Sequence, residues 1–230
     1  MKYAIIAAGE GSRLQQEGVA LPKPLVKLRG EAMIDRLLRI FRNNGAEEIV
    51  VIVNCLNPLT EQHLRELQAQ GLAADVRLVV KTTPSSMHSF AELAPYLGDG
   101  PFCLTTVDTI FRENEFAEYI RHFQQSTLDG CMAVTDYIDD ESPLYVATDE
   151  SLRITGFHDT CDATASFPAA STCSAPWRCK RSTAACAKAE AACATSSAPW
   201  WRTGCTSKPG PSPKFSTLTM PQTSRRPRSF

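Results

Sequence analysis

The pattern of hydrophobic and polar positions changes its period repeatedly along the first 160 residues. Short runs of consecutive apolar residues are typical of strands buried on both faces. They alternate with segments whose apolar residues recur every three or four positions, as on one face of a helix. The pattern predicts strands at Lys2–Ala7, Glu48–Val53, Val76–Val80, Phe102–Val107, Cys131–Thr135 and Leu144–Thr148, and helices at Glu31–Asn44, Leu59–Gln70, Ser85–Leu97 and Asn114–Gln125. This alternation predicts an α/β fold with a mainly parallel sheet sandwiched between helices.

The predicted topology also indicates where function should be sought. In open parallel sheets, ligands bind beyond the carboxyl ends of the strands. The loops that follow Ala7, Val80 and Thr106 are therefore the expected places for chemistry.

The alternation stops at about residue 160. The last 70 residues contain no Ile, Val, Tyr or Asn and a single Leu, but they hold all three tryptophans and 8 of the 15 prolines. A segment so poor in branched aliphatic residues cannot bury a core large enough to offset the entropy of ordering it. We therefore divide the chain into an incomplete α/β domain over residues 1–160 and an aberrant, low-complexity, poorly ordered tail over residues 161–230.

The charged residues follow the same division. The net charge is −1, but residues 1–160 carry 23 acidic and 14 basic side chains, whereas residues 161–230 carry 2 acidic and 10 basic ones. The arginines of the tail lack the interleaved aromatic residues of a nucleic-acid stacking platform, so we expect no nucleic-acid partner. No apolar run approaches the roughly 20 residues that span a bilayer. The first residues do not have the pattern of a signal peptide, and we expect a cytoplasmic protein without membrane contact.

The cysteines divide in the same way. Cys55, Cys103 and Cys131 lie in or beside apolar runs, which indicates reduced and mostly buried thiols. The other six lie between Cys161 and Cys205 and contain no CxxC pair, which argues against a zinc site.

A shifted reading frame is one explanation of the tail's composition. When the third base of each codon is joined to the first two of the next, Pro168–Ser174 allows Gly-Gly-Ile-Tyr-Met-Leu. In the same frame Lys214–Arg225 allows Val-Phe-Asp-Val-Asp-His-Ala-Ala-Asp-Ile. Strand-forming aliphatic residues and carboxylates thus return where an α/β pattern would need them. The alternative is a genuine disordered basic tail.

The first predicted strand is followed by a loop that combines Gly9, Gly11, Ser12 and Arg13. A glycine-rich turn after a strand can present backbone N–H groups to a phosphate. The dinucleotide fingerprint would need a third glycine where Leu14 stands, and the Walker A spacing is absent. The loop therefore indicates phosphate binding of another kind.

A lysine braced by two prolines follows this loop. Pro22 and Pro24 restrict the backbone on either side of Lys23. Together Arg13 and Lys23 would bring two cations to the glycine loop, as a bound triphosphate requires. The alternative for Lys23 is a solvated surface lysine.

The stretch AAGEGSRL followed by PKPLVKLRGEAMIDRLL resembles the sugar-phosphate nucleotidyltransferases, which include glucose-1-phosphate thymidylyltransferases and mannose-1-phosphate guanylyltransferases. The resemblance covers roughly residues 1–160 and implies a nucleotide-diphospho-sugar transferase type of fold. It implies the transfer of a nucleoside monophosphate from an NTP to a sugar 1-phosphate or a similar phosphorylated acceptor, such as phosphocholine, with release of pyrophosphate.

The resemblance also implies roles for single residues of the glycine loop and of the lysine turn. Ala8, Gly9, Gly11 and Ser12 would line the base and phosphates, with Ser12 standing where the family often has Thr. Arg13 would hold the β- and γ-phosphates, and Lys23 would lie near the α-phosphate and the incoming phosphate oxygen.

The strand at Phe102–Val107 is followed by Asp108, which matches the family's magnesium-binding aspartate, although Val107 replaces the glycine that usually precedes it. Mg²⁺ prefers oxygen ligands such as this carboxylate. The alternative is an Asx turn that caps the next segment. The family's second carboxylate and its Gly-Gly-Ile-Tyr-like strand are absent from the chain as translated. We therefore expect half of the metal site and the acceptor pocket to be missing.

Two serines complete the predicted site. Ser85 and Ser86 begin a predicted helix, where hydroxyl groups commonly cap exposed N–H groups. In the family this loop contacts the nucleobase and ribose, so both interpretations stand. A second functional hypothesis is a non-catalytic nucleotide sensor or regulatory subunit that keeps the loop without the chemistry.

Overall fold

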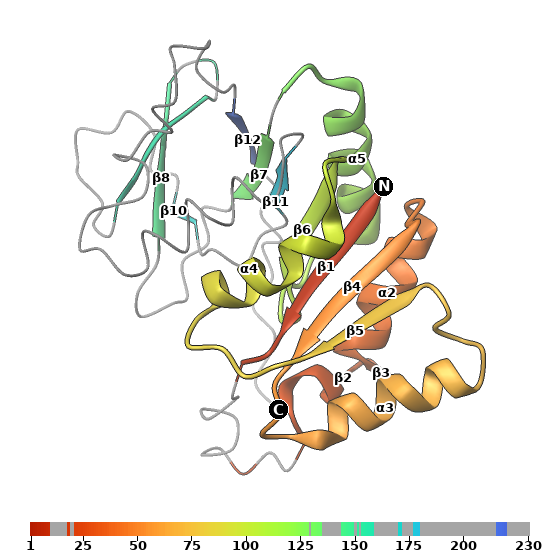
Figure 1. The fold of residues 1–230 in the computed structure, drawn as a ribbon. Helices are drawn as coiled ribbons and strands as arrows, with labels where there is room; N and C mark the ends of the chain where they lie inside the picture. Colours follow the sequence, from red (N-terminus) through yellow and green to blue (C-terminus); the bar gives the residue numbers. More distant parts are fainter. Residues whose placement is uncertain are drawn as a thin grey trace.

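The computed structural model describes residues 1–9, 18, 21–128, 130–134, 144–149, 151, 153–158, 170–171, 177–179 and 215–219 (Figure 1). The strands of the main sheet are β1 (Lys2–Ala7), β4 (Glu48–Val53), β5 (Val76–Val80), β6 (Phe102–Thr106), β7 (Gly130–Val134), β11 (Trp177–Cys179) and β12 (Phe215–Thr219). The helices are α2 (Met33–Asn43), α3 (Pro58–Ala69), α4 (Ser86–Leu97) and α5 (Glu113–Gln125), with a 3₁₀ turn, η1, at Lys23–Leu25.

The main sheet has the order β12-β7-β11-β6-β1-β4-β5 in the described part of the chain. Strand β1 pairs in parallel with β4 and β6, and β4 pairs in parallel with β5. Only β11 runs antiparallel to its neighbours, β6 and β7, among these pairings. The predicted mainly parallel sheet is confirmed.

A smaller sheet lies beside the main one. It contains β8 (Leu144–Thr148) between β9 (Ile154–His158) and β10 (Ala170–Ser171), all antiparallel. In residues 161–230 the structure describes β10, β11 and β12, and the rest of the predicted poorly ordered tail lies outside the described residues.

The start of α2 differs from the sequence expectation. The helix begins at Met33 and not at Glu31, because Glu31–Ala32 form β3, which pairs with β2 (Lys27–Leu28). The two strands are joined through Arg29 and Gly30, whose φ angles are 52° and 91°. Glycine adopts such left-handed angles readily, so a tight turn replaces the first turn of the predicted helix.

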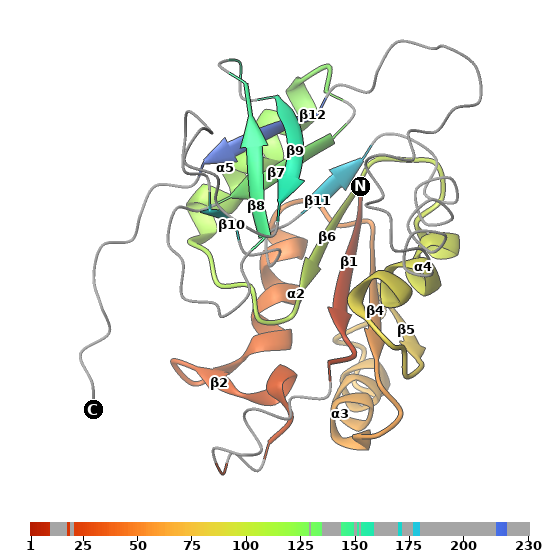
Figure 2. The same ribbon diagram turned by 90° about the vertical axis from the view of Figure 1, so that its left-hand side faces the viewer.

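Helices cover both faces of the sheet (Figure 2). Strand residues alternate between the faces. On one face Ala4, Ile6, Val50 and Ile52 pack with Phe90, Leu93 and Leu97 of α4. On the other face Tyr3, Ile5, Ile49 and Val51 pack with buried residues of α2, α3 and α5. None of the helices in the described ranges has an apolar stretch long enough to cross a membrane.

An aromatic cluster centred on Phe116 joins α5 to the sheet and to α2. The Phe116 ring stacks on Phe111 at 4.5 Å and on Phe41 at 5.6 Å between centroids. Tyr3 and Tyr119 each lie 6.4 Å from it in tilted arrangements. Phe116 is fully buried, and its packing therefore fixes the segment that leads into α5.

Phe116→Ala should lower the free energy of unfolding by about 3–5 kcal/mol, because it leaves a cavity at the centre of the aromatic cluster. Phe116→Leu refills most of that space and should cost about 1 kcal/mol. Urea titration followed by circular dichroism measures both. Ile110→Ala is the control, since Ile110 is 64% exposed, and its effect should stay within about 0.5 kcal/mol. Equal losses for Phe116→Ala and Ile110→Ala would contradict the assignment.

Candidate active site

The carboxyl ends of the parallel strands meet at one edge of the sheet. Ala7 of β1 pairs with Val53 of β4, which pairs with Val80 of β5. On the other side, Ile6 pairs with Thr106 of β6. The three loops singled out from the sequence therefore begin at the same edge.

The glycine loop begins at this edge with Ala8 and Gly9. Ala8 is buried and Gly9 is exposed. A Cβ atom added to Gly9 would meet no atom of the described residues within 4 Å, and the φ of Gly9 lies outside the left-handed region. The described residues therefore do not themselves require glycine at this position, and none of them blocks the approach of a ligand to it. The other predicted loop residues, Gly11, Ser12 and Arg13, lie outside the described residues.

Lys23 lies in the 3₁₀ turn η1, where the flanking prolines set the backbone. Pro22 has φ −62° and ψ 146° and accepts a hydrogen bond from the Leu25 N–H at 2.8 Å. Pro24 is buried. The turn is also joined to α2, because the Met33 N–H donates to the Val26 carbonyl at 3.0 Å. Lys23 therefore projects from a braced turn and not from a free loop.

Lys23 and Asp108, 85 positions apart, form an ion pair. The Lys23 Nζ atom lies 2.6 Å from Asp108 Oδ2, and the side chains are 38% and 35% exposed. Asp108 lies two residues beyond the end of β6, while the N-cap of α5 is Arg112, so the Asp108 carboxylate does not cap that helix. The structure thus brings together two of the three residues predicted to be catalytic.

Opposing influences set the pKa of Asp108. Burial acts to raise it, but hydrogen bonds from Lys23 and Thr106, with the lysine's charge, bring the pKa below the ordinary value. The carboxyl group is therefore ionised at neutral pH, as an ion pair or a metal ligand requires.

Two arginines of α2 hold the segment after Asp108. Arg36 Nη2 donates to the Phe111 carbonyl at 2.5 Å, and its guanidinium lies over the Phe111 ring at 5.3 Å. Arg39 donates to both carboxylate oxygens of Glu31 and of Glu113, at 2.8–2.9 Å. Because α2 also contacts the Lys23 turn, it positions both partners of the ion pair. These two arginines were not identified from the sequence. The available signal was their spacing of three positions, which places both on one face of the helix.

At this edge the Asp108 carboxylate could serve as a ligand of a divalent cation. Among the described residues no group of three or more His, Cys, Asp or Glu side chains is placed to hold a metal ion. Mg²⁺ is commonly bound through one or two carboxylates together with substrate phosphates. Asp108 fits such a site if phosphate oxygens supply further ligands. In this structure its Oδ2 atom is paired with the Lys23 ammonium group.

The serines after β5 have a visible structural role. Ser85 is the N-cap of α4, and its hydroxyl oxygen accepts from the His88 backbone N–H at 3.5 Å and lies 2.8 Å from His88 Nδ1. Ser86 is the first helical residue and is exposed. The nearby Ser89 is buried and bonded to Thr83 at 2.6 Å between hydroxyl oxygens. Capping therefore accounts for Ser85, while Ser86 faces solvent at the edge of the sheet.

A residue that the sequence reasoning missed is Asn54, the first residue after β4. It is 6% exposed, and its side chain bonds the start of the glycine loop. The sequence feature that could have identified Asn54 is its place as a polar residue directly after the apolar run EIVVIV, at the edge of the sheet where ligands bind.

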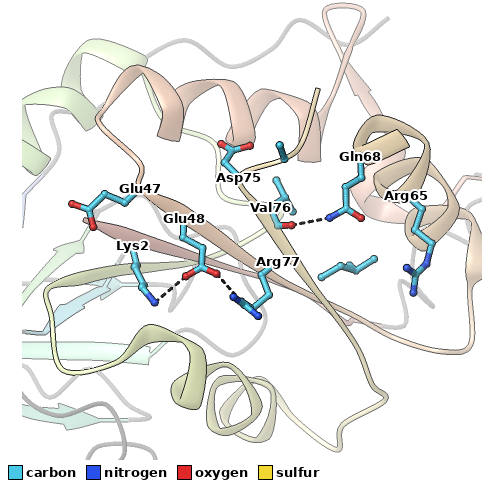
Figure 3. Close-up of a pocket in the computed structure, with 10 residues that line it drawn as sticks. Lys2, Glu47, Glu48, Arg65, Gln68, Asp75, Val76 and Arg77 are labelled. Atoms are coloured by element: carbon cyan, nitrogen blue, oxygen red, sulfur yellow. Dashed lines mark hydrogen bonds and ion pairs between the residues drawn. The ribbon is translucent and has the colours of Figure 1, made fainter. Parts of the chain in front are cut away.

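A pocket of ≈ 690 Å³ lies at the opposite edge, near the amino ends of β4 and β5 (Figure 3). The pocket lining carries charges of both signs, and Glu48 accepts from two cations of that lining, Lys2 at 2.9 Å and Arg77 at 2.6 Å. Asp75 accepts from Arg42 at 2.6 Å. Because carboxylates balance the cations, this pocket is a poor site for a polyphosphate.

Comparison with known proteins gives consistent matches. The profile of the MobA-like NTP transferase domain matches residues 3–195. The N-acetylmuramate alpha-1-phosphate uridylyltransferase of Caulobacter vibrioides is 33% identical over 167 residues, 69% of this chain and 62% of the relative. The chain thus spans about three fifths of that relative's length.

Two solved structures share the fold. One is a Bacillus anthracis protein described as a glucose-1-phosphate thymidylyltransferase, with a TM-score of 0.69 and 14% identity over 96% of this chain and 87% of that one. The other is the inositol-1-phosphate CTP transferase of T. maritima, with a TM-score of 0.65 and 18% identity over 95% of this chain and 84% of that one. The predicted nucleotide-diphospho-sugar transferase type of fold is confirmed.

The Lys23–Asp108 pair should contribute to stability in a pH-dependent way. In a double-mutant cycle with Lys23→Met and Asp108→Asn, we expect a coupling energy of about 1 kcal/mol near pH 7, since both side chains are more than a third exposed. The folded-state pKa of Asp108 is lowered. The coupling should therefore persist above the unfolded pKa of about 3.9 and disappear as the pH falls through the folded value.

Urea unfolding of the four proteins across this pH range measures the coupling. A matched cycle on the exposed pair Lys81–Glu92, 2.7 Å apart, serves as the reference for a surface ion pair. Zero coupling of Lys23 with Asp108 near neutral pH would show that the pair does not form in solution.

Proposed function

The chain belongs to the family of MobA-like NTP transferase domains, and from that premise we propose that it transfers a nucleoside monophosphate from an NTP to a sugar 1-phosphate or a similar phosphorylated acceptor, releasing pyrophosphate. The observation that carries the proposal is the Lys23–Asp108 ion pair beyond the carboxyl ends of the parallel strands, at the edge where the glycine loop begins. The relatives named above use different nucleotides, and the proposal covers the reaction class. We place the reaction in the cytoplasm.

The chain's own residues would act by position and charge. Lys23 projects from its braced turn with 38% of its side chain exposed, so its ammonium group can exchange the Asp108 carboxylate for a phosphate oxygen. The backbone N–H of Gly9 would donate a hydrogen bond to the polyphosphate. Arg13 would neutralise charge on the leaving pyrophosphate. The proposed transfer is an in-line attack of the acceptor phosphate on the α-phosphorus.

Proton transfer has a small part in this chemistry. The acceptor is a phosphate monoester that is already anionic near neutral pH. Orientation of the two substrates and stabilisation of charge in the transition state therefore supply most of the acceleration. When bound, Mg²⁺ would neutralise phosphate charge. Asp108 is the residue of this chain that we propose to hold it, with Ser85 and Ser86 lining the nucleotide side.

We also propose that residues 161–230 are read out of frame. The support is compositional: after about residue 160 the branched aliphatic residues are reduced to a single Leu, and an alternative frame allows more of them. In that case the chain as translated lacks the family's second carboxylate and part of its acceptor pocket. Sequencing the gene around codons 158–168 tests this directly.

Pyrophosphate release tests the activity. We expect the protein with a restored reading frame to release pyrophosphate from one of ATP, CTP, GTP, UTP or dTTP when one of a panel of sugar 1-phosphates is present. Lys23→Ala and Asp108→Ala should each reduce turnover by about 10²-fold or more, because each removes one electrostatic stabiliser of the transition state.

Lys27→Ala and Asp99→Ala are the matched controls, because both residues are exposed and lie outside the proposed site. Their turnover should stay within about twofold of the parent, as for ordinary surface substitutions. Near-normal turnover of the Lys23 and Asp108 variants would refute their roles. Nucleotide binding without pyrophosphate release for every acceptor would favour a sensor over an enzyme.

A further inference from the structure

We infer that Asn54 is a positioning residue of the nucleotide site, which fixes the first two carbonyl groups of the glycine loop so that the Gly9 N–H faces the bound polyphosphate. The inference rests on the proposed function, because it takes an NTP as the ligand.

The hydrogen bonds of Asn54 use both ends of its amide. Its Nδ2 atom donates to the Ala8 carbonyl at 3.1 Å and to the Gly9 carbonyl at 3.0 Å. Its Oδ1 atom accepts from the Asn57 backbone N–H at 3.0 Å. Asn54 is 6% exposed. The donor end of its amide is thus used by the first two carbonyl groups of the glycine loop.

The sheet register explains how Asn54 reaches the loop. Ala7 pairs with Val53 in the parallel ladder of β1 and β4. Ala8 and Asn54 are the next residues on each strand and leave the sheet at the same level. The side chain therefore spans the gap between two neighbouring strand ends where the backbone ladder has stopped.

The hydrogen bond from Asn54 to the Ala8 carbonyl also sets the direction of the Gly9 N–H, because both groups belong to one planar peptide unit. In a planar trans peptide the N–H points away from the C=O of the same unit. The Ala8–Gly9 peptide is trans, and its carbonyl is held by Asn54, so the Gly9 N–H points away from Asn54. In the part of the chain that the structure describes, no atom lies within 4 Å of a Cβ built on Gly9, so these residues leave room beside it. A phosphate oxygen there would meet a donor whose direction is already set.

Asn54 also lies next to a link with the third loop at this edge. The Cys55 N–H donates to the Thr82 hydroxyl at 3.2 Å, and Thr82 follows β5. Residues 54 and 55 therefore connect the loops after β1, β4 and β5. A change at Asn54 acts on the glycine loop through its carbonyl groups, whereas the Cys55 link is made by the backbone and persists.

Asparagine is the side chain that this arrangement needs. Aspartate has nearly the same shape and can still accept from Asn57, but it would place a carboxylate oxygen against two carbonyl oxygens. Leucine has a similar volume and neither donates nor accepts, which would leave the buried polar groups without these partners.

The test is equilibrium binding of ATP, CTP, GTP, UTP and dTTP to the full chain, measured by calorimetry. For the NTP that the parent binds, Asn54→Asp should raise Kd by about tenfold or more, the equivalent of one or two lost hydrogen bonds. Asn54→Ser, a milder change, should raise it less. In the in-frame enzyme the KM for the NTP should rise while the KM for the acceptor stays within about twofold, a split that general destabilisation would not produce.

Asn57→Ala is the matched control. Asn57 caps α3 by accepting from the Leu59 N–H at 3.2 Å, and its loss should lower Tm by about 2–4 °C. The substitution leaves the bonds from Asn54 to the glycine loop intact, so the NTP affinity of Asn57→Ala should match that of the parent.

The outcomes are distinguishable. If the parent binds an NTP and both Asn54 variants bind it equally well, the inference is overturned and the proposed function stands. If Asn57→Ala weakens binding as much as the Asn54 variants do, Asn54 has only a structural role and the inference is again overturned. If the parent binds none of the five nucleotides, the inference is overturned for the chain as translated, and the proposed function is then decided separately by pyrophosphate release from the protein with a restored reading frame.

Discussion

The parallel register of β1, β4, β5 and β6 is the constraint on which the rest of this molecule depends. It brings four strand ends to one edge, so that loops far apart in the sequence begin side by side. Backbone hydrogen bonds hold that register, and the apolar residues on both faces of the sheet make any slip costly. The apolar core therefore fixes the positions of the loops at this edge, although its own residues take no part in the chemistry.

Beyond the strand ends, where the backbone ladder stops, side chains link the loops at this edge to one another. Asn54 connects the loops after β1 and β4, and Lys23 connects its braced turn to Asp108 after β6. Arg36 and Arg39 hold the segment beyond Asp108 against α2. The aromatic cluster around Phe116 packs against the same segment through Phe111. Polar contacts and core packing thus hold the same segment.

Charge distinguishes the two edges of the sheet. At the amino edge Glu48 and Asp75 neutralise the neighbouring cations, which leaves little attraction for an anion. At the carboxyl edge an ammonium group and a carboxylate face each other with about a third of each side chain exposed. Both charges can be redistributed when a polyphosphate and a divalent cation arrive together, because the pair is screened by water and only moderately stable.

The hydrophobic pattern alone determined the main elements, since β1, β4, β5 and β8 have the predicted bounds, and buried strands leave an unambiguous apolar run in the sequence. The glycine loop, Lys23 and Asp108 were also identified from the sequence, because their residue types and order are specific. Only the tertiary structure decided that Lys23 meets Asp108 and that Asn54 holds the glycine loop. These outcomes depend on contacts between residues distant in the chain, and a periodicity of a few residues carries no information about which strand ends become neighbours.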